Sequence, residues 1–225
     1  MQYSKVVLPS PIETGAALAR LLTTGKLLSA ILTTSFHLLS AFTLAVLMGV
    51  IFGIIAGIQS EFEKTIAPII SALQGIPPIA WIVLALLWFG SGSATTIFTI
   101  MVATLPIIFF STVEGMSSLP RSLLEMARLF STPTSLLLKD LYFPHLLSYL
   151  FPSCAAGLGI AWRVAVMSEL LSSEAGIGAE LNLARINLDT DEVMAWIAVT
   201  IALIWVSQYL ILRPLRHLLT PWQRI

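Results

Sequence analysis

Charged residues are scarce in this sequence. Asp, Glu, Lys and Arg make up 11% of its 225 residues, whereas a soluble domain carries about 25%. Hydrophobic residues make up 57%. This balance excludes a soluble globular protein and predicts an all-α integral membrane protein in a lipid bilayer. The formal net charge is zero, so the basic excess typical of a nucleic-acid-binding protein is missing as well.

The sequence has a single cysteine and lacks two common motifs of metal and phosphate sites. The one cysteine, Cys154, lies in an apolar stretch, which excludes an intrachain disulfide and favours a packing role. The sequence contains neither a G-x-x-x-x-G-K-[ST] phosphate loop nor an H-E-x-x-H zinc motif. We therefore expect this chain to bind no metal and no cofactor.

Long apolar runs occupy most of the chain instead. Each is free or nearly free of charge and long enough to cross the roughly 30 Å of a bilayer's hydrocarbon core. We predict a single domain, 1–225, with a short interfacial helix at 16–22 ahead of five spans. The predicted spans are residues 36–58, 66–89, 94–113, 145–171 and 193–212.

Small residues recur at every fourth position of the first span. They are Ala41, Ala45, Gly49, Gly53 and Gly57. This spacing places them on one helix face, where small side chains let another helix approach closely, because packing drives helix association in lipid. We predict a helix-packing face rather than a binding site.

The second span is interrupted by Gly75-Ile76-Pro77-Pro78. Two prolines remove two helical donors, so the backbone groups they free must be satisfied by protein or by water in a cavity. The pattern fits a broken helix that lines a transport pathway, and it fits a simple proline kink equally well.

The fourth span carries two charges, Arg163 and Glu169. Charges at membrane depth are expensive and normally face a protein interior or an aqueous cavity. Because the two residues are six positions apart, they do not share a helix face and need not pair with each other. Lining a pathway and forming structural pairs between helices both stay open.

Residues 119–144 form the one long polar interruption. Ser117 and Ser118 are placed to cap a first short helix. Three of its charged residues fall on one stripe at i, i+4 and i+7: Arg121, Glu125 and Arg128. Thr132-Pro133 then ends this helix and starts a second one at 134–143. A charged, amphipathic helix pair at the membrane surface is typical of a docking element.

The spacing within this loop resembles the EAA loop of ABC-importer permeases. That pattern is Glu-Ala-Ala, three residues, Gly, nine residues, then Ile-x-Leu-Pro. The corresponding residues are Glu125-Met126-Ala127, Ser131 and 141–144. Met126 replaces the first Ala and Ser131 replaces the Gly, so the bend after the first helix is expected to differ.

The resemblance narrows to the nitrate/sulfonate/taurine branch of the type I (MetI-like) permeases. Residues 75–81 with 87–90 are similar to its proline-tryptophan segment, and residues 157–164 with 174–178 to its fourth-span signature. Leu8-Pro9-Ser10-Pro11 is similar to a segment that in many relatives follows an extra N-terminal span, which this chain lacks.

The resemblance implies a function and an assembly. The chain would be the permease subunit of an ATP-driven importer of a small anionic or polar solute such as taurine, a sulfonate, nitrate or bicarbonate. Its expected partners are two ATPase subunits that hold ATP and Mg²⁺, a second copy or a homologous permease, and an extracytoplasmic solute-binding protein. The chain itself would not be an enzyme.

The resemblance also implies roles for individual residues. The expected ATPase-coupling residues are Glu125, Met126, Ala127, Arg128, Ser131, Leu141 and Pro144. The expected residues of the translocation pathway are Pro77, Pro78, Trp81, Trp162, Arg163 and Glu169. An anionic solute would suit Arg163, but the nearby Glu169 could cancel its charge. The presence of Arg163 therefore does not identify the solute.

Five spans place the two termini on opposite sides of the membrane. The C-terminal tail is basic, with Arg213, Arg216, His217 and Arg224. Basic residues favour the cytoplasmic side, so we expect the C-terminus and the loop at 119–144 to be cytoplasmic and the N-terminus external. Three basic residues near the N-terminus oppose this orientation. The resemblance further implies that the protein lies in the plasma (inner) membrane of a bacterium.

Two other functional classes stay open. An ATPase-independent secondary transporter or channel would predict charged relay residues in several spans and often an inverted repeat, but only the fourth span carries clear charges. An intramembrane serine enzyme would need a base such as His37 or His145, and no nucleophile-elbow motif supports it. All three Asp residues fall outside the span cores, which excludes an aspartyl pair.

Overall fold

The computed structural model describes residues 9–212, which contain helices and turns but no strand. The helices are α1 (Pro11–Thr23), α2 (Lys26–Ile58), α3 (Ser60–Gly75), α4 (Pro78–Phe89), α5 (Ser93–Ser117), α6 (Arg121–Leu129), α7 (Thr134–Leu137), α8 (Phe143–Ser172), α9 (Ile177–Ile186) and α10 (Thr190–Val206). Two π-helical segments, η1 (Leu138–Tyr142) and η2 (Ser207–Leu212), continue α7 and α10. The predicted all-α fold class is confirmed. Leu8 and the basic C-terminal tail lie outside the described residues.

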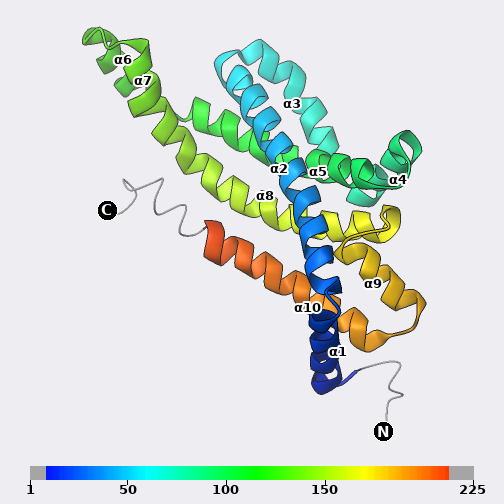
Figure 1. Cartoon of the computed structure of the whole chain (residues 1–225). Helices are drawn as coiled ribbons and strands as arrows, with labels where there is room; N and C mark the ends of the chain where they lie inside the picture. Colours follow the sequence, from blue (N-terminus) through cyan, green and yellow to red (C-terminus); the bar gives the residue numbers. More distant parts are fainter. Residues whose placement is uncertain (1–8, 213–225) are drawn as a thin grey trace.

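In the described part of the chain, four helices are long and apolar enough to cross a membrane singly, and α3 with α4 forms a fifth candidate that is bent by 98°. A Cβ added at Gly57 would touch Met116, so the end of α2 lies beside the end of α5. At the opposite end of α5, the Gly92 N–H donates to the Ser172 carbonyl at 2.8 Å. α3 and α4 together therefore carry the chain from one end of α5 to the other as one broken crossing (Figure 1).

Several helices extend beyond the apolar runs that predicted them. α2 begins at Lys26 rather than near 36, and the helix predicted at 134–143 does not end but continues through η1 into α8. The segment after α8 contains α9, in which Ile177 and Ala184 are buried. An apolar run marks only the part of a helix that suits hydrocarbon, so the polar ends of these helices were not predicted.

The small-residue face of α2 lies against α5, and the two helices run in the same direction. Ala41 and Ala45 have no exposed surface. A Cβ added at Gly49, Gly53 or Gly57 would lie 2.9, 2.5 or 2.4 Å from a Cβ of α5. The α5 partners are, in the same order, Ile108, Thr112 and Met116. Because both rows repeat every four residues, one helix fits the other along several turns.

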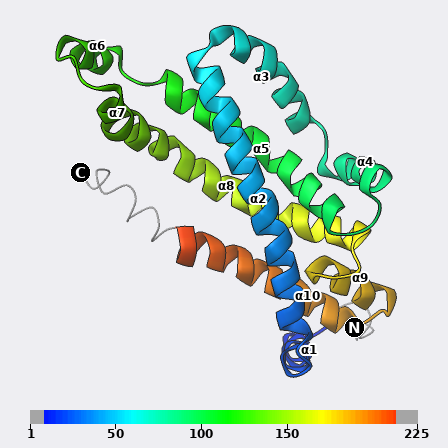
Figure 2. The same ribbon diagram turned by 45° about the horizontal axis from the view of Figure 1, so that its top comes forward.

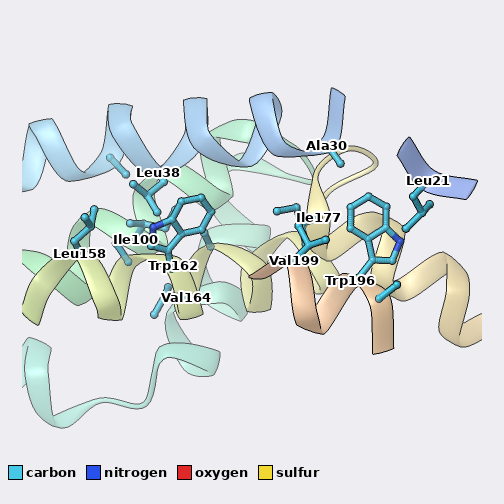
Figure 3. Close-up of a cluster of buried hydrophobic side chains, with 14 of the residues drawn as sticks. Leu21, Ala30, Leu38, Ile100, Leu158, Trp162, Val164, Ile177, Trp196 and Val199 are labelled. Atoms are coloured by element: carbon cyan, nitrogen blue, oxygen red, sulfur yellow. The ribbon is translucent and has the colours of Figure 1, made fainter. Parts of the chain in front are cut away.

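The larger apolar core surrounds two buried tryptophans (Figure 3). Trp162 of α8 lies beside Leu38 of α2 and Ile100 of α5, and its indole N–H donates to the Ser207 hydroxyl at 3.1 Å. Trp196 of α10 has no exposed surface and lies beside Leu21 of α1. α1 thus covers the end of the core formed by α10.

Glu169 joins four helices from a position with no exposed surface. Its Oε1 lies 2.8 Å from His37 Nδ1, and its Oε2 accepts from the Thr34 hydroxyl at 2.8 Å and the Gly178 N–H at 3.1 Å. On the other side of the imidazole, His37 Nε2 lies 2.9 Å from the Ser93 hydroxyl. The network therefore links α8 to α2, to α9 and to the start of α5.

Two glycines let the chain fold closely over this carboxylate. Gly176 has a φ of +112°, and a Cβ there would lie 2.4 Å from Glu169 Oε2. A Cβ at Gly178 would lie 2.2 Å from the Val166 carbonyl oxygen. Any side chain at either position would push the start of α9 away from α8.

The packing of α2 on α5 predicts that Gly53→Ala lowers the amount of folded protein. The added methyl would overlap Thr112 and force the two helices apart along the whole row. The measurement is the folded fraction in mild detergent, by size-exclusion chromatography and thermal unfolding. Gly15→Ala is the matched control, because Gly15 lies within α1 with nothing near its added Cβ. Equal folded yields for the two variants would contradict the packing assignment.

The buried network predicts that Glu169→Ala costs about 3 kcal/mol or more, because it leaves buried donors without an acceptor. Glu174→Ala, at an exposed carboxylate five residues further on, should change stability little. Thermal unfolding of both variants checks this. In a double-mutant cycle with Thr34→Val, the stability lost by the double variant should be smaller than the sum of the losses of the two single variants. Simple additivity would show that the carboxylate and the Thr34 hydroxyl do not stabilise each other.

Candidate functional site

The polar loop projects from one end of the helix bundle. Figures 1 and 2 both show α6 and α7 at the start of α8, beyond α2 and α5 and far from α1 and α9. Glu125 and Arg128 of α6 are exposed. Leu129 and Phe130 at its end are 84% and 78% exposed. Large apolar side chains this exposed, next to charges, are typical of a surface that binds a partner.

A groove of about 340 Å³ separates α6 from α7 and η1. It is lined by Leu123, Met126, Ala127, Phe130, Thr132, Leu136, Leu137, Asp140 and Leu141. The structure therefore brings Met126, Ala127 and Leu141 of the expected coupling residues together around one groove. Glu125 and Arg128 lie exposed on the same helix.

The start of α6 differs from the prediction. Ser117 is the last residue of α5, and the Ser118 hydroxyl lies 3.4 Å from the Gly115 carbonyl and 3.1 Å from His145 Nε2, so neither serine caps α6. Pro120 occupies the capping position, with no side-chain hydrogen bond. A proline disfavours helical geometry in the residue before it, so the serines belong to the end of α5.

The end of α6 has the bend expected of a glycine, although Ser131 stands there. Ser131 has a φ of +49°. Its N–H donates to the Arg128 carbonyl at 3.0 Å, and the Thr132 N–H donates to the Ala127 carbonyl at 2.9 Å. These two bonds form a Schellman cap, whose left-handed residue is usually Gly. The expectation that the serine changes the bend is therefore wrong, because the backbone bonds hold the serine in that conformation.

Pro144 lies where the loop joins α8, in the first turn after η1. In a regular helix its missing N–H would have bonded to the Asp140 carbonyl, and its ring would crowd that oxygen. Just before it, the Phe143 N–H bonds to the Leu138 carbonyl, five residues back. A π-helical turn is wider than an α-helical one, which gives the proline room without ending the helix.

The proline pair at the middle of the second crossing separates two helices. Ile76 ends α3, Pro77 precedes α4 and Pro78 is its first residue. The indole N–H of Trp81 reaches back across the break to the Leu73 carbonyl at 3.3 Å. This bond satisfies one of the backbone groups that the break frees. The structure has the broken helix rather than the simple kink.

The structure separates the three residues expected in the pathway from α8. Trp162 and Glu169 point into the chain and are buried, whereas Arg163 is exposed. The Arg163 Nε–H donates to the Gly159 carbonyl at 3.0 Å. Within residues 9–212, no group of three His, Cys, Asp or Glu side chains is placed to hold a metal ion.

Sequence reasoning missed His37 and Thr34 as partners of Glu169. A signal was present, because these polar residues are three positions apart in an apolar span and so face the same way. A carboxylate buried nearby needs donors of this kind. What the sequence lacks is any indication that α2 and α8 meet at this level.

Comparison with known proteins extends over nearly the whole chain. Residues 49–224 match the family model of the binding-protein-dependent transport system inner membrane component. The riboflavin transport system permease protein RibX of Chloroflexus aurantiacus is 33% identical, over 98% of this chain and 82% of that protein. The taurine transport system permease protein TauC of Escherichia coli is 32% identical, over 79% of this chain and 64% of that protein.

A solved structure supports the fold alone. The chain is similar to one in the inward-facing MetNI methionine ABC transporter, with a TM-score of 0.63 and 16% identity over 80% of this chain and 93% of that chain. The resemblance stated from the loop and from the proline-tryptophan segment is confirmed by the family match and the relatives. The chain therefore belongs to the inner membrane components of binding-protein-dependent transport systems, which are the permease subunits of ABC transporters and rely on a separate ATPase.

Proposed function

We propose that α6 and α7 dock this permease onto its ATPase and that Glu125 is the charge contacting that subunit. The observation that carries the proposal is the exposure of Glu125 beside Leu129 and Phe130 at an end of the bundle that projects beyond the other helices. A coupling element has to be rigid within itself and open toward a partner. The Schellman cap at Ser131 and the shared groove support the first requirement.

The complete transporter then contains two permeases, either two copies of this chain or this chain with a homologue. Each loop binds one of two ATPase subunits, which hold ATP and Mg²⁺. An extracytoplasmic binding protein delivers the solute. The relatives are named for riboflavin, taurine, aliphatic sulfonates and nitrate, and we propose a small anionic or polar solute for this chain.

The proposed orientation puts the loop in the cytoplasm of a bacterium, because ATP is there. α10 begins beside α1, where Arg20 forms an ion pair with Asp191, and it ends at the opposite end of the bundle. The end of α10 then faces the cytoplasm, and α1 faces the outside. This agrees with five crossings of the inner membrane.

The proposed pathway runs along the broken α3–α4 crossing and the exposed face of α8 that carries Arg163. Pro77, Pro78 and Trp81 shape the break. Trp162 and Glu169 lie behind this surface and hold α8 in place, so their contribution to transport is indirect.

Glu125→Arg should leave the permease folded but release the ATPase, because the residue faces solvent rather than the core. The measurement is the amount of ATPase that co-purifies with the tagged permease, together with ATP-dependent uptake. Both should fall at least tenfold, while the chromatographic profile of the permease stays unchanged. Glu61→Arg is the matched control, since Glu61 is an exposed carboxylate in the first turn of α3, which begins at the same end of the bundle. Undiminished ATPase binding in Glu125→Arg would refute the docking proposal.

Ser131→Val should weaken ATPase binding and Ser131→Gly should preserve or strengthen it. A left-handed conformation costs about 1–2 kcal/mol for an L-residue, and a β-branched side chain suits it worse than serine. Ser135→Val, in the ordinary helical geometry of α7, controls for the lost hydroxyl. Retention of the ATPase on the immobilised permease is the readout. If the valine variants at 131 and 135 behave alike, the cap geometry does not contribute to docking.

A further inference from the structure

Arg163 is a charge within a membrane-spanning helix that no other part of the described chain covers. It lies nine residues before the end of α8, which is about 14 Å along the helix. Its side chain is exposed, as are its neighbours on that face of α8, which carry no charge. They are Pro152, Ala156, Met167 and Leu171.

The charge of Arg163 is not neutralised within residues 9–212. The one hydrogen bond of its side chain there runs from Nε–H to the Gly159 carbonyl, and no carboxylate lies within ion-pair distance. Glu169, the acidic residue that could have cancelled it, is occupied by His37, Thr34 and Gly178 inside the chain. The terminal nitrogens of the guanidinium thus keep their donors available.

A second polar group approaches the glycine to which this guanidinium donates. A Cβ added at Gly159 would lie 2.9 Å from the side-chain nitrogen of Gln208, in η2. Arg163 and Gln208 therefore both approach Gly159, one from the next turn of α8 and the other from the neighbouring helix. The result is a donor-rich spot on a surface that is otherwise apolar.

A guanidinium facing hydrocarbon is too costly for this spot to face lipid. Water or protein must cover it. In a homodimer whose twofold axis passes this face, Arg163 would meet the same face of the second copy, which carries no carboxylate among its exposed residues, so the local charge would stay positive. A water-filled pathway beside this face would concentrate anions at this level.

We propose that Arg163, with Gln208 approaching the same glycine, is the point of the pathway that selects a solute carrying a negatively charged group such as a sulfonate, nitrate or carboxylate. A guanidinium binds such planar or multi-oxygen anions through two hydrogen bonds at once. The inference rests on the proposed function, because it requires that this face of α8 lines the pathway, and it adds the charge of the solute.

The test measures the local potential one helical turn from Arg163. In a Cys154→Ala background, Met167→Cys supplies the one thiol of this chain, and labelling of this chain is followed in the complete transporter in membranes. The probes are the anionic 2-sulfonatoethyl methanethiosulfonate and its cationic trimethylammonium-ethyl counterpart. Arg163→Gln removes the positive charge and should lower the ratio of the anionic to the cationic labelling rate about threefold. Arg163→Lys should keep the ratio, and only protein eluting as folded complex is counted.

A second arm addresses the solute. Ethanesulfonate or nitrate should slow labelling at Met167→Cys when Arg163 or lysine is present, and neutral riboflavin should not. Leu47→Cys, on an exposed part of α2, is the control. Its ratio of labelling rates should be the same with Arg163 as with Arg163→Gln. The proposal is overturned by an unchanged ratio in Arg163→Gln or by a thiol that neither reagent reaches. It is also overturned if riboflavin slows the labelling, or if neither anion does. The labelling is done with Glu125 intact and reports on the surroundings of residue 167, whereas the Glu125 test reports on ATPase retention, so a failure here is distinct from a failure there.

Discussion

A single buried carboxylate sets the rotation of α8, and the rest of the structure depends on that rotation. Burying a charge is tolerated only when donors surround it. Glu169 finds them in His37 and Thr34 of α2 and in the backbone of the first turn of α9. Turning α8 about its axis would strip the carboxylate of all three. The network therefore fixes which side of α8 faces inward, and with it the direction of every other side chain on that helix.

The same rotation explains why two charges in one span have different surroundings. Residues six positions apart on a helix point about 120° away from each other. Once Glu169 faces α2, Arg163 has to leave the core, and Trp162 fills the space between α2 and α5 instead. Glu169 therefore stabilises the fold from inside, whereas Arg163 lies exposed on the outer face of α8. Their proximity in sequence is misleading, because their chemical environments are unrelated.

Much of the architecture follows from the sequence, since lipid imposes strong local rules. Apolar runs marked the crossings, the proline pair marked the break, and the spacing around Glu125 indicated the loop and the family. What could not be predicted depends on contacts between distant segments. His37 and Glu169 are 132 positions apart, and neither shows its partner. The length of α2, the helix α9 and the conformation of Ser131 likewise depend on tertiary contacts and backbone bonds that no local pattern encodes.

The α2–α5 pair and the Glu169 network divide the task of holding the bundle together. The glycine row works by shape, through direct contact along several turns near the loop end. The network works by hydrogen bonding at the other end, where α5 begins. Packing resists separation of the helices, whereas the hydrogen bonds resist their rotation. Together they make α2, α5 and α8 one rigid unit, against which α4 and α10 make smaller contacts.

The helix from Thr134 to Ser172 runs 39 residues without a break, which corresponds to about 58 Å. It carries the wall of the docking groove at one end and Arg163 and Glu169 toward the other. A rod of this kind transmits force without a hinge. A tilt of about 5° displaces one end by about 5 Å relative to the other over that length. A displacement of the loop is therefore transmitted across the full thickness of the membrane.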